Sequence, residues 1–318
     1  MNDGRIHIAL VANERYRPGL LATRHSMTSA CSDPDRLVFH EFGDADMAPF
    51  ESRFPLREWN GSKLPYLRLF LPEILPDCDW IIYSDVDTLW FRDPQELWNE
   101  RDDSVSICWV KDFPAIAMEF DRWAAANGLK IPPGHEYACS GVALLNLRKW
   151  RETGFTARAI DFFRTYGCPP YPDQDALNVL SAGDAKIIDR DWDVMIPARR
   201  WRPCVLHLTG VGLRFAAGEN YDGNVPQYVF WFAYYRRNIL HLPSKPLRLG
   251  LKVRFTALKI VSFAFGALLE ALDRHAGPYR WKQFLMRIRR QTAFAGLALR
   301  PALATSKPPN LSVAVETA

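Results

Sequence analysis

Two aspartates separated by one residue, Asp85 and Asp87, directly follow the apolar run Trp80–Tyr83. Such a run predicts a buried parallel strand. Successive side chains of an extended chain point to opposite faces, so both carboxylates are expected to point the same way. Neighbouring carboxylates repel each other unless a cation lies between them, and ligands of open α/β sheets bind at the carboxyl ends of the strands. The pattern therefore predicts a divalent cation that holds a diphosphate.

Two other interpretations of the aspartate pair are open. Asp85 and Asp87 could cap the helix that follows, which is a common role of aspartate. They could also be the nucleophilic pair of a phosphotransferase of the haloacid-dehalogenase type, in which Thr or Val stands four residues after the first aspartate. Leu89 stands there instead, and the strand is far from the N-terminus. The metal site is therefore the favoured interpretation.

Segments typical of strands and of helices alternate through residue 208, which predicts an α/β fold with a largely parallel sheet covered on both faces. Strands are predicted over 6–12, 37–42, 80–83, 105–110, 142–147, 186–188 and 205–208. Helices are predicted over 18–28, 63–71, 118–126, 151–166 and 173–180, with a short one from Asp93-Pro94.

Charge divides the chain into two parts. Residues 245–318 contain 13 Lys and Arg against 3 Asp and Glu, whereas residues 1–244 contain 27 against 33. We expect the α/β domain over 1–244 and a basic helical appendage over 245–318, with a disordered end after about residue 304. The six cysteines are scattered singly and no apolar leader precedes Ile6. These features favour a reducing cytoplasm, with neither a zinc cluster nor a redox motif.

Four further stretches accompany the aspartate pair. In chain order they are Ala-Leu-Val-Ala-Asn-Glu-Arg-Tyr at 9–16, Ser-Gly-Val-Ala-Leu-Leu-Asn-Leu-Arg-Lys-Trp at 140–150, Asp-Gln-Asp-Ala-Leu-Asn at 173–178 and His-Leu-Thr-Gly at 207–210. Together with the aspartate pair, this ordered set resembles glycosyltransferase family 8, which includes glycogenin and bacterial lipopolysaccharide glycosyltransferases. The resemblance covers roughly residues 6–215.

The resemblance implies a GT-A fold, a UDP-sugar donor, Mn²⁺ and transfer with retention at the anomeric carbon. It implies that Asp85, Asp87 and His207 bind the metal. A mixed oxygen and imidazole shell suits Mn²⁺ better than Mg²⁺, which is the alternative. It also implies catalytic roles for Asp173 and Gln174 beside the reacting carbon. The donor-binding positions that it implies are Val11, Asn13, Tyr16, Arg68, Val86, Ser140, Gly141, Gly210 and Arg214.

Some of these side chains also have a simpler interpretation. His207 could be a hydrogen-bonded core histidine. Asp173, Gln174 and Asp175 could form the acidic first turn of a helix, and this is the role that we expect for Asp175. Asp112, which follows the strand predicted over 105–110, could approach the acceptor or lie in solvent.

The chain departs from the family pattern at two places. Cys139 stands where the family usually has Asn, which removes an amide expected near the sugar. Leu213-Arg214-Phe215 stands where the family usually has Lys-Pro-Trp, so Arg214 is the expected substitute for a phosphate-binding lysine. The departures leave open a non-catalytic nucleotide-sugar-binding sensor or scaffold as the alternative to a transferase.

The segment 245–300 combines apolar runs with Lys and Arg. Its longest run with few charges, Ile260–Leu269, has about ten residues, whereas a bilayer span needs roughly 20. A basic amphipathic helix with aromatic residues is typical of binding to an anionic membrane surface. Packing on the domain and partner binding are the alternatives. No nucleic-acid recognition motif appears, so nucleic acid is not expected as a partner.

Together these features predict a transferase that is peripheral on the inner face of the cell membrane. It is expected to move a hexose or pentose to a glycan or glycolipid acceptor of lipopolysaccharide, capsule or another surface glycan.

Overall fold

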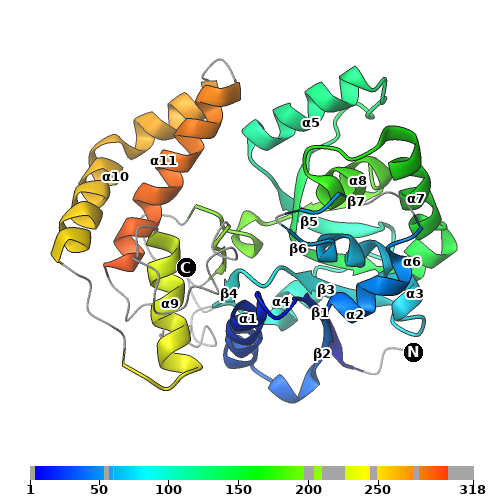
Figure 1. Cartoon of the computed structure of the whole chain (residues 1–318), viewed down its shortest axis with the longest axis horizontal. Helices are drawn as coiled ribbons and strands as arrows, with labels where there is room; N and C mark the ends of the chain where they lie inside the picture. Colours follow the sequence, from blue (N-terminus) through cyan, green and yellow to red (C-terminus); the bar gives the residue numbers. More distant parts are fainter. Residues whose placement is uncertain are drawn as a thin grey trace, which may run out of the picture.

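A six-stranded sheet forms the centre of the structure, which is a computed structural model (Figure 1). β6 runs antiparallel to both of its neighbours, and the other strand pairs are parallel. The predicted, largely parallel sheet is thus confirmed, with one reversed strand near its middle. In spatial order the strands are β2 (Leu37–Phe42), β1 (Ile6–Val11), β3 (Trp80–Ser84), β6 (Ala138–Asn146), β5 (Ile107–Lys111) and β7 (Ala185–Ile188).

The described part of the chain comprises residues 4–53, 57–59, 61–196, 204–209, 226–243, 249–275 and 279–299. Within these ranges, no helix combines the length and the apolar character that crossing a bilayer requires.

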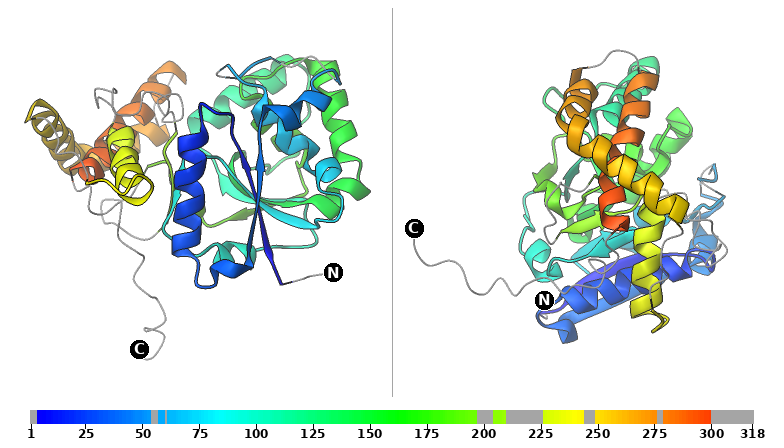
Figure 2. Two further views of the ribbon diagram at one scale, coloured as in Figure 1. Left: turned by 60° about the horizontal axis from the view of Figure 1, so that its bottom comes forward. Right: turned by 90° about the vertical axis from the view of Figure 1, so that its left-hand side faces the viewer.

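Apolar side chains supply a core on each face of the sheet. Ile8 and Leu10 of β1 pack with helix α1 (Arg17–Ala30) on one face, while Ala9 belongs to the core on the other. Figure 2, left, shows α1 on one side of the sheet and the helices of the opposite layer on the other. Because both faces are covered, a central strand such as β3 is buried along its whole length.

Short helices connect the strands. Asp93 caps α4 by accepting a hydrogen bond from the Gln95 N–H, as its position before a proline predicts. The helices of this region are α2 (Asp44–Met47), α3 (Leu71–Ile74), α4 (Pro94–Trp98), α5 (Pro114–Ala126), α6 (Leu147–Glu152), α7 (Phe155–Tyr166) and α8 (Pro172–Leu180), with 3₁₀ turns at Pro34–Arg36, Ala48–Phe50, Leu64–Phe70 and Arg190–Trp192.

Two predicted helices differ from the structure. Residues 63–71 form a 3₁₀ helix followed by the one-turn α3. Pro72 has no N–H, and its ring would clash with the carbonyl of Arg68 in a continuous α-helix. Residues 151–166 are divided between α6 and α7 at Gly154, whose φ of 62° interrupts the helix.

A second sheet pairs β4 (Thr88–Trp90) with β8 (Val205–His207) in antiparallel fashion. The register sets Thr88 opposite His207. The histidine at the end of β8 therefore lies beside the residue that follows Asp87. This small sheet brings the C-terminal motif of the domain to the aspartate pair.

Buried hydroxyl groups of α1 form hydrogen bonds with backbone groups of β4, on the edge that does not pair with β8. The Thr23 hydroxyl donates to the Thr88 carbonyl at 2.8 Å, and the Ser26 hydroxyl accepts from the Trp90 N–H at 2.9 Å. A buried backbone group without such a partner would be costly. The helix therefore fixes the strand that leads out of the aspartate pair.

Three helices follow the sheet region: α9 (Pro226–Asn238), α10 (Leu249–His275) and α11 (Tyr279–Ala298). α10 lies at the outer edge of the molecule, and α11 lies between it and the sheet region (Figures 1 and 2). Phe294 and Leu297 of α11 belong to the same apolar cluster as the side chains of β1. The boundary proposed at residue 244 stays a prediction, and the tail after residue 304 lies outside the described residues.

We expect Ser26→Ala to lower the free energy of unfolding by about 1–3 kcal/mol, because the buried N–H of Trp90 loses its acceptor. Urea unfolding measures this change. Ser29→Ala, on the exposed side of the same helix, is the matched control and should stay within about 0.5 kcal/mol of the parent. Equal effects of the two substitutions would contradict a structural role for the Ser26 hydroxyl.

Candidate active site

Asp85 and Asp87 lie in a turn between β3 and β4, not in the extended conformation that the sequence predicts. The Thr88 hydroxyl donates to the Asp85 carbonyl at 2.9 Å, and the Asp85 N–H donates to the Gly141 carbonyl at 2.7 Å. The Thr88 hydroxyl thus occupies the Asp85 carbonyl, which in a continuing strand would accept a hydrogen bond from the neighbouring strand. The two carboxylates converge because of this turn rather than because of strand alternation.

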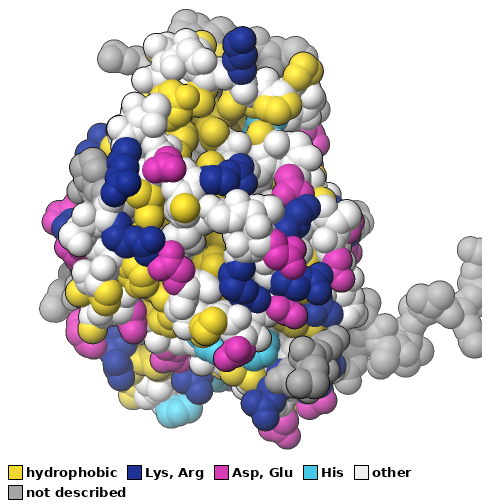
Figure 3. All heavy atoms as spheres, turned by 90° about the vertical axis from the view of Figure 1, so that its right-hand side faces the viewer, with side chains coloured by type: hydrophobic (Ala, Val, Ile, Leu, Met, Phe, Trp, Pro, Cys, Tyr) yellow, Lys and Arg dark blue, Asp and Glu magenta, His cyan; other side chains and the backbone are white. Residues whose placement is uncertain are grey.

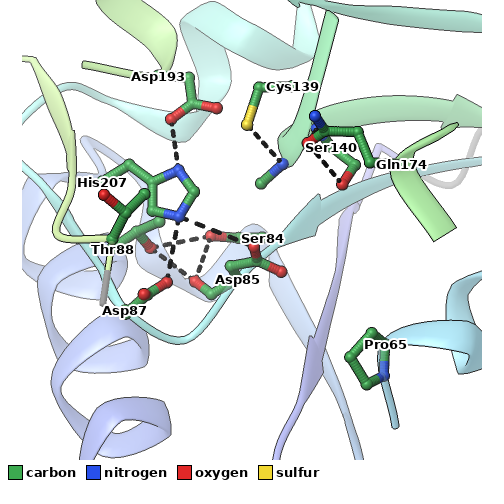
Figure 4. Close-up of polar contacts among 12 residues, drawn as sticks. Pro65, Ser84, Asp85, Asp87, Thr88, Cys139, Ser140, Gln174, Asp193 and His207 are labelled. Atoms are coloured by element: carbon green, nitrogen blue, oxygen red, sulfur yellow. Dashed lines mark hydrogen bonds and ion pairs between the residues drawn. The ribbon is translucent and has the colours of Figure 1, made fainter. Parts of the chain in front are cut away.

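Both carboxylates face His207 (Figure 4). The imidazole Nε2 lies 3.2 Å from Asp87 Oδ1 and 3.8 Å from Asp85 Oδ2. One ligand atom from each of the three residues can be chosen so that all lie within 4.8 Å of one another. Burial raises the pKa of Asp85 to about 6, although Arg68 and His207 oppose this rise. Two carboxylates and an imidazole at this spacing form a donor set that could hold a divalent cation.

Asp193, which the sequence does not single out, holds the other nitrogen of His207. Its Oδ1 lies 2.9 Å from His207 Nδ1, and its side chain is fully buried. Burial disfavours the imidazolium, but Asp193 and Asp87 outweigh it and raise the pKa of His207 well above its ordinary value. A carboxylate behind a histidine in this way fixes the orientation of the ring. Asp193 ends the run Asp-Arg-Asp-Trp-Asp at 189–193, in which spacing does not distinguish one acid from another.

Gly141 lets β6 pass directly against His207. A Cβ atom at this position would lie 2.3 Å from His207 Cε1 and 3.3 Å from Asp85 Oδ2, so only glycine leaves the ring in place. Cys139 packs behind the same ring, and burial raises the pKa of its thiol well above the ordinary value. A protonated thiol is a poor metal ligand, which favours a packing role for this side chain.

Arg68 is buried and joins the aspartate turn to helix α8. Its Nη2 lies 3.0 Å from Asp85 Oδ1, and its Nε lies 3.1 Å from Asp173 Oδ2. Nη1 donates to the Ser140 carbonyl at 2.8 Å, and the guanidinium lies over the Tyr83 ring at 4.0 Å from its centroid. All of its nitrogens are therefore engaged, which holds the two carboxylates in a fixed relation.

Gln174, in the first turn of α8, is held from three sides. Its Oε1 accepts from the Ser140 N–H at 3.1 Å, while its Nε2 donates to Asp112 Oδ2 at 2.8 Å and to the Tyr137 hydroxyl at 2.9 Å. Asp112 is buried, which raises its pKa to about 6. The alternative in which Asp112 lies in solvent is therefore wrong.

Asp175 lies in the acidic first turn of α8, as predicted. Its Oδ2 accepts from the N–H of Tyr171, the residue before the helix, at 2.9 Å. Its Oδ1 accepts from the Tyr137 hydroxyl at 2.5 Å, and burial raises its pKa to about 7. The carboxylate thus also fixes the tyrosine that supports Gln174.

A pocket at the carboxyl ends of β1 and β3 brings most of the predicted positions together. His207 and Gly141 lie behind the two aspartates and do not line it, and Gly210 and Arg214 lie outside the described residues. The predicted residues that line it are Val11, Asn13, Tyr16, Arg68, Asp85, Val86, Asp87, Ser140, Asp173 and Gln174.

Several lining residues have no signal in the sequence. The rings of Trp59 and Tyr171 lie 5.7 Å apart, and both come from loops without a motif. Only the fold places these aromatic side chains beside the pocket. The remaining lining residues are Ala12, which stands within the motif at 9–16, and Ser62, Leu64, Pro65 and Tyr83.

Comparisons with known proteins agree with the geometry. The description of the family "Glycosyl transferase family 8" matches residues 8–209. A putative glycosyltransferase of Haemophilus influenzae is 32% identical over 125 residues, which cover 39% of this chain and 37% of that protein. The lipopolysaccharide 1,2-glucosyltransferase of Escherichia coli is 28% identical over 137 residues, covering 42% of this chain and 39% of that protein. The matched region is thus under half the length of either relative.

A solved structure of a galactosyltransferase, LgtC, in complex with donor and acceptor sugar analogues, is also similar. The superposition has a TM-score of 0.52 at 21% identity, and it covers 64% of this chain and 87% of that one. This likeness shows the GT-A fold. Because the family description spans well over half of the chain, the protein belongs to glycosyl transferase family 8.

Proposed function

We propose that the chain is a retaining, Mn²⁺-dependent glycosyltransferase that moves a hexose or pentose from a UDP-sugar to a surface-glycan acceptor of the lipopolysaccharide or capsule type. The observation that carries this proposal is the convergence of Asp85, Asp87 and His207 beside one pocket. The residues proposed for the nucleotide, Asn13 and Tyr16, line the same pocket. A donor could therefore place its base by β1 and its diphosphate by the turn.

The donor set fits a manganese ion. Two carboxylates and one imidazole nitrogen match the mixed preference of Mn²⁺, whereas Mg²⁺ prefers oxygen and water. Asp193 supports this fit, because it leaves His207 Nε2 facing the two aspartates. When bound, the ion would neutralise the charge of the diphosphate leaving group.

The side chains of α8 would act on the sugar. Arg68 holds the Asp173 carboxylate at the pocket wall, where it can accept hydrogen bonds from sugar hydroxyl groups. Gln174 is a neutral amide fixed by Ser140 and Asp112. Its oxygen can stabilise an oxocarbenium-like carbon but is a weak nucleophile, so we favour front-face displacement over a covalent intermediate. The bond to the phosphate oxygen breaks, the acceptor oxygen bonds on the same face, and the acceptor proton passes to the phosphate.

We also propose that α10 attaches the enzyme to an anionic membrane, where a glycolipid acceptor would be found. Val253, Ile260 and Phe265 are 62%, 62% and 52% exposed on the outermost helix. Lys252 and Lys259 are exposed beside them. Apolar side chains flanked by cations suit the interface of an anionic bilayer. On the opposite face of the molecule, basic and acidic side chains are interspersed (Figure 3).

Asp87→Asn keeps the shape of the side chain but removes a charge, so we expect Mn²⁺-dependent UDP binding to weaken at least about tenfold and transfer to be lost. Calorimetry with UDP, in Mn²⁺ and in EDTA, measures the affinity. Asp103→Asn, whose side chain is 72% exposed, is the matched control. Unchanged binding in the Asp87 variant would refute the metal site. Tight binding by the parent without release of sugar from any UDP-sugar would favour the sensor or scaffold alternative.

For Gln174→Ala we expect turnover to fall by roughly 10²-fold, because the reacting carbon loses an oriented dipole. The KM for the donor should change less than about threefold if the amide acts mainly in the transition state. Steady-state kinetics separate the two constants, and thermal unfolding verifies that the variant is folded. A loss of donor affinity at unchanged turnover would exclude the catalytic role.

The membrane proposal predicts that the protein floats with vesicles containing anionic lipid and stays behind with neutral ones. Ile260→Glu combined with Phe265→Glu should abolish flotation, because two charged carboxylates would have to enter the membrane interface. Leu240→Glu with Leu242→Glu, at sites 40% and 42% exposed outside α10, is the control and should float like the parent. Equal flotation of both double variants would show that α10 is not the contact.

A further inference from the structure

One face of α11 points toward the sheet region and carries a charged residue within an apolar stripe. Met286, Arg290 and Phe294 follow one another at intervals of four residues, which places them on the same side of the helix. Met286 packs in the apolar cluster of Phe120, and Phe294 packs in the core that contains β1. Arg290 therefore lies, partly buried, between two buried apolar side chains.

The guanidinium of Arg290 reaches the end of β8. Its Nη1 donates to the hydroxyl of Thr209, two residues after His207. The residue between them, Leu208, donates its N–H to the Asp87 carbonyl at 2.8 Å. Arg290 thus contacts the segment after β8, and this segment is hydrogen-bonded to the backbone of Asp87, one of the proposed metal ligands.

Within the described residues, Arg290 has no carboxylate at ion-pair distance. Its Nε is buried and makes no hydrogen bond with the described part of the chain. Burial and the neighbouring Arg287 lower its pKa, and Asp87 partly offsets this. A partly buried guanidinium with no carboxylate partner among the described residues is costly. Such a cation beside an acidic centre indicates an anionic ligand.

The balance of charge at the proposed metal site also indicates an anionic ligand for Arg290. A divalent ion held by two carboxylates has its charge largely cancelled by its own ligands. Arg68 is occupied by Asp85 and Asp173. A nucleoside diphosphate, which gains negative charge as the sugar leaves, needs a further donor of positive charge. Guanidinium groups suit phosphate oxygens because their N–H groups form a planar fork.

We propose that Arg290 binds the diphosphate of the nucleotide-sugar donor, so that α11 supplies part of the active site. The inference rests on the proposed function. It assigns to Arg290 a contact for which the sequence offered only Arg214, a residue outside the described part of the chain. The C-terminal helices would then contribute to catalysis as well as to attachment.

The test is calorimetry of the full chain with UDP and with UMP in Mn²⁺. Arg290→Gln should weaken UDP binding by roughly tenfold to a hundredfold, the size of a lost hydrogen bond to a charged group, and UMP binding by less than threefold. Arg290→Lys should recover part of the affinity, because it keeps the charge but not the fork. Arg287→Gln, at an exposed site one turn earlier on the same helix, is the charge-matched control and should bind both nucleotides like the parent.

Thermal unfolding without nucleotide separates a binding role from a structural one. If Arg290 binds the diphosphate, Arg290→Gln should unfold at the same temperature as the parent or higher, since a cation without a carboxylate partner in the described part of the chain is removed. A lower Tm with equal losses for UDP and UMP would show that the residue only fixes α11, and unchanged UDP affinity would equally overturn the inference. Failure of the parent itself to bind UDP would refute the proposed function instead.

Discussion

Electrostatic repulsion among closely spaced acids is the constraint on which this site depends. Asp85, Asp87 and Asp193 converge on one imidazole. Among the described residues, only Arg68 adds a permanent positive charge at ion-pair distance from Asp85. Burial already raises the pKa of Asp85 to about 6. The arrangement is therefore more stable with an additional cation than without one. The proposed metal site is supported by this excess of negative charge more directly than by any single residue.

The sheet brings the acids together by using elements that are distant along the chain. The turn after β3 supplies two carboxylates, β8 supplies His207, and β6 passes behind the ring with no side chain at Gly141. Because a Cβ atom at that position would overlap the imidazole, close packing of β6 is a condition for the geometry of the site. Arg68 then connects the turn to α8. Packing and chemistry depend on the same contacts.

The sequence predicts the parts of this site that depend on local pattern. The apolar run before Asp85 and the spacing of the two acids are enough to place a strand and a carboxylate pair at its end. His207 could be assigned only through the family resemblance. The turn was not predictable, because it results from the Thr88 hydroxyl competing for the Asp85 carbonyl.

Residues whose role comes from tertiary contact could not be identified from the sequence. Asp193 contacts His207, which is 14 residues away in sequence, and Arg290 contacts Thr209, which is 81 residues away. In each case neighbouring residues of the same type offer equal candidates in sequence, and only the packing of the helix or strand selects one. The burial of Asp112 also depends on tertiary structure, since its carboxylate contacts Gln174, which is distant in sequence.

The net charge of the C-terminal part is therefore an incomplete guide to its function. Lys252 and Lys259 face outward on α10, whereas Arg290 faces inward on α11. The two helices pack together through Phe255 and Ala295, so the outward and inward faces belong to one packed helix pair. If both proposals hold, removing the chain after residue 244 would abolish attachment and weaken donor binding together. Only substitutions confined to one face can show that a single basic segment has two separate ligands, a membrane outside and a diphosphate inside.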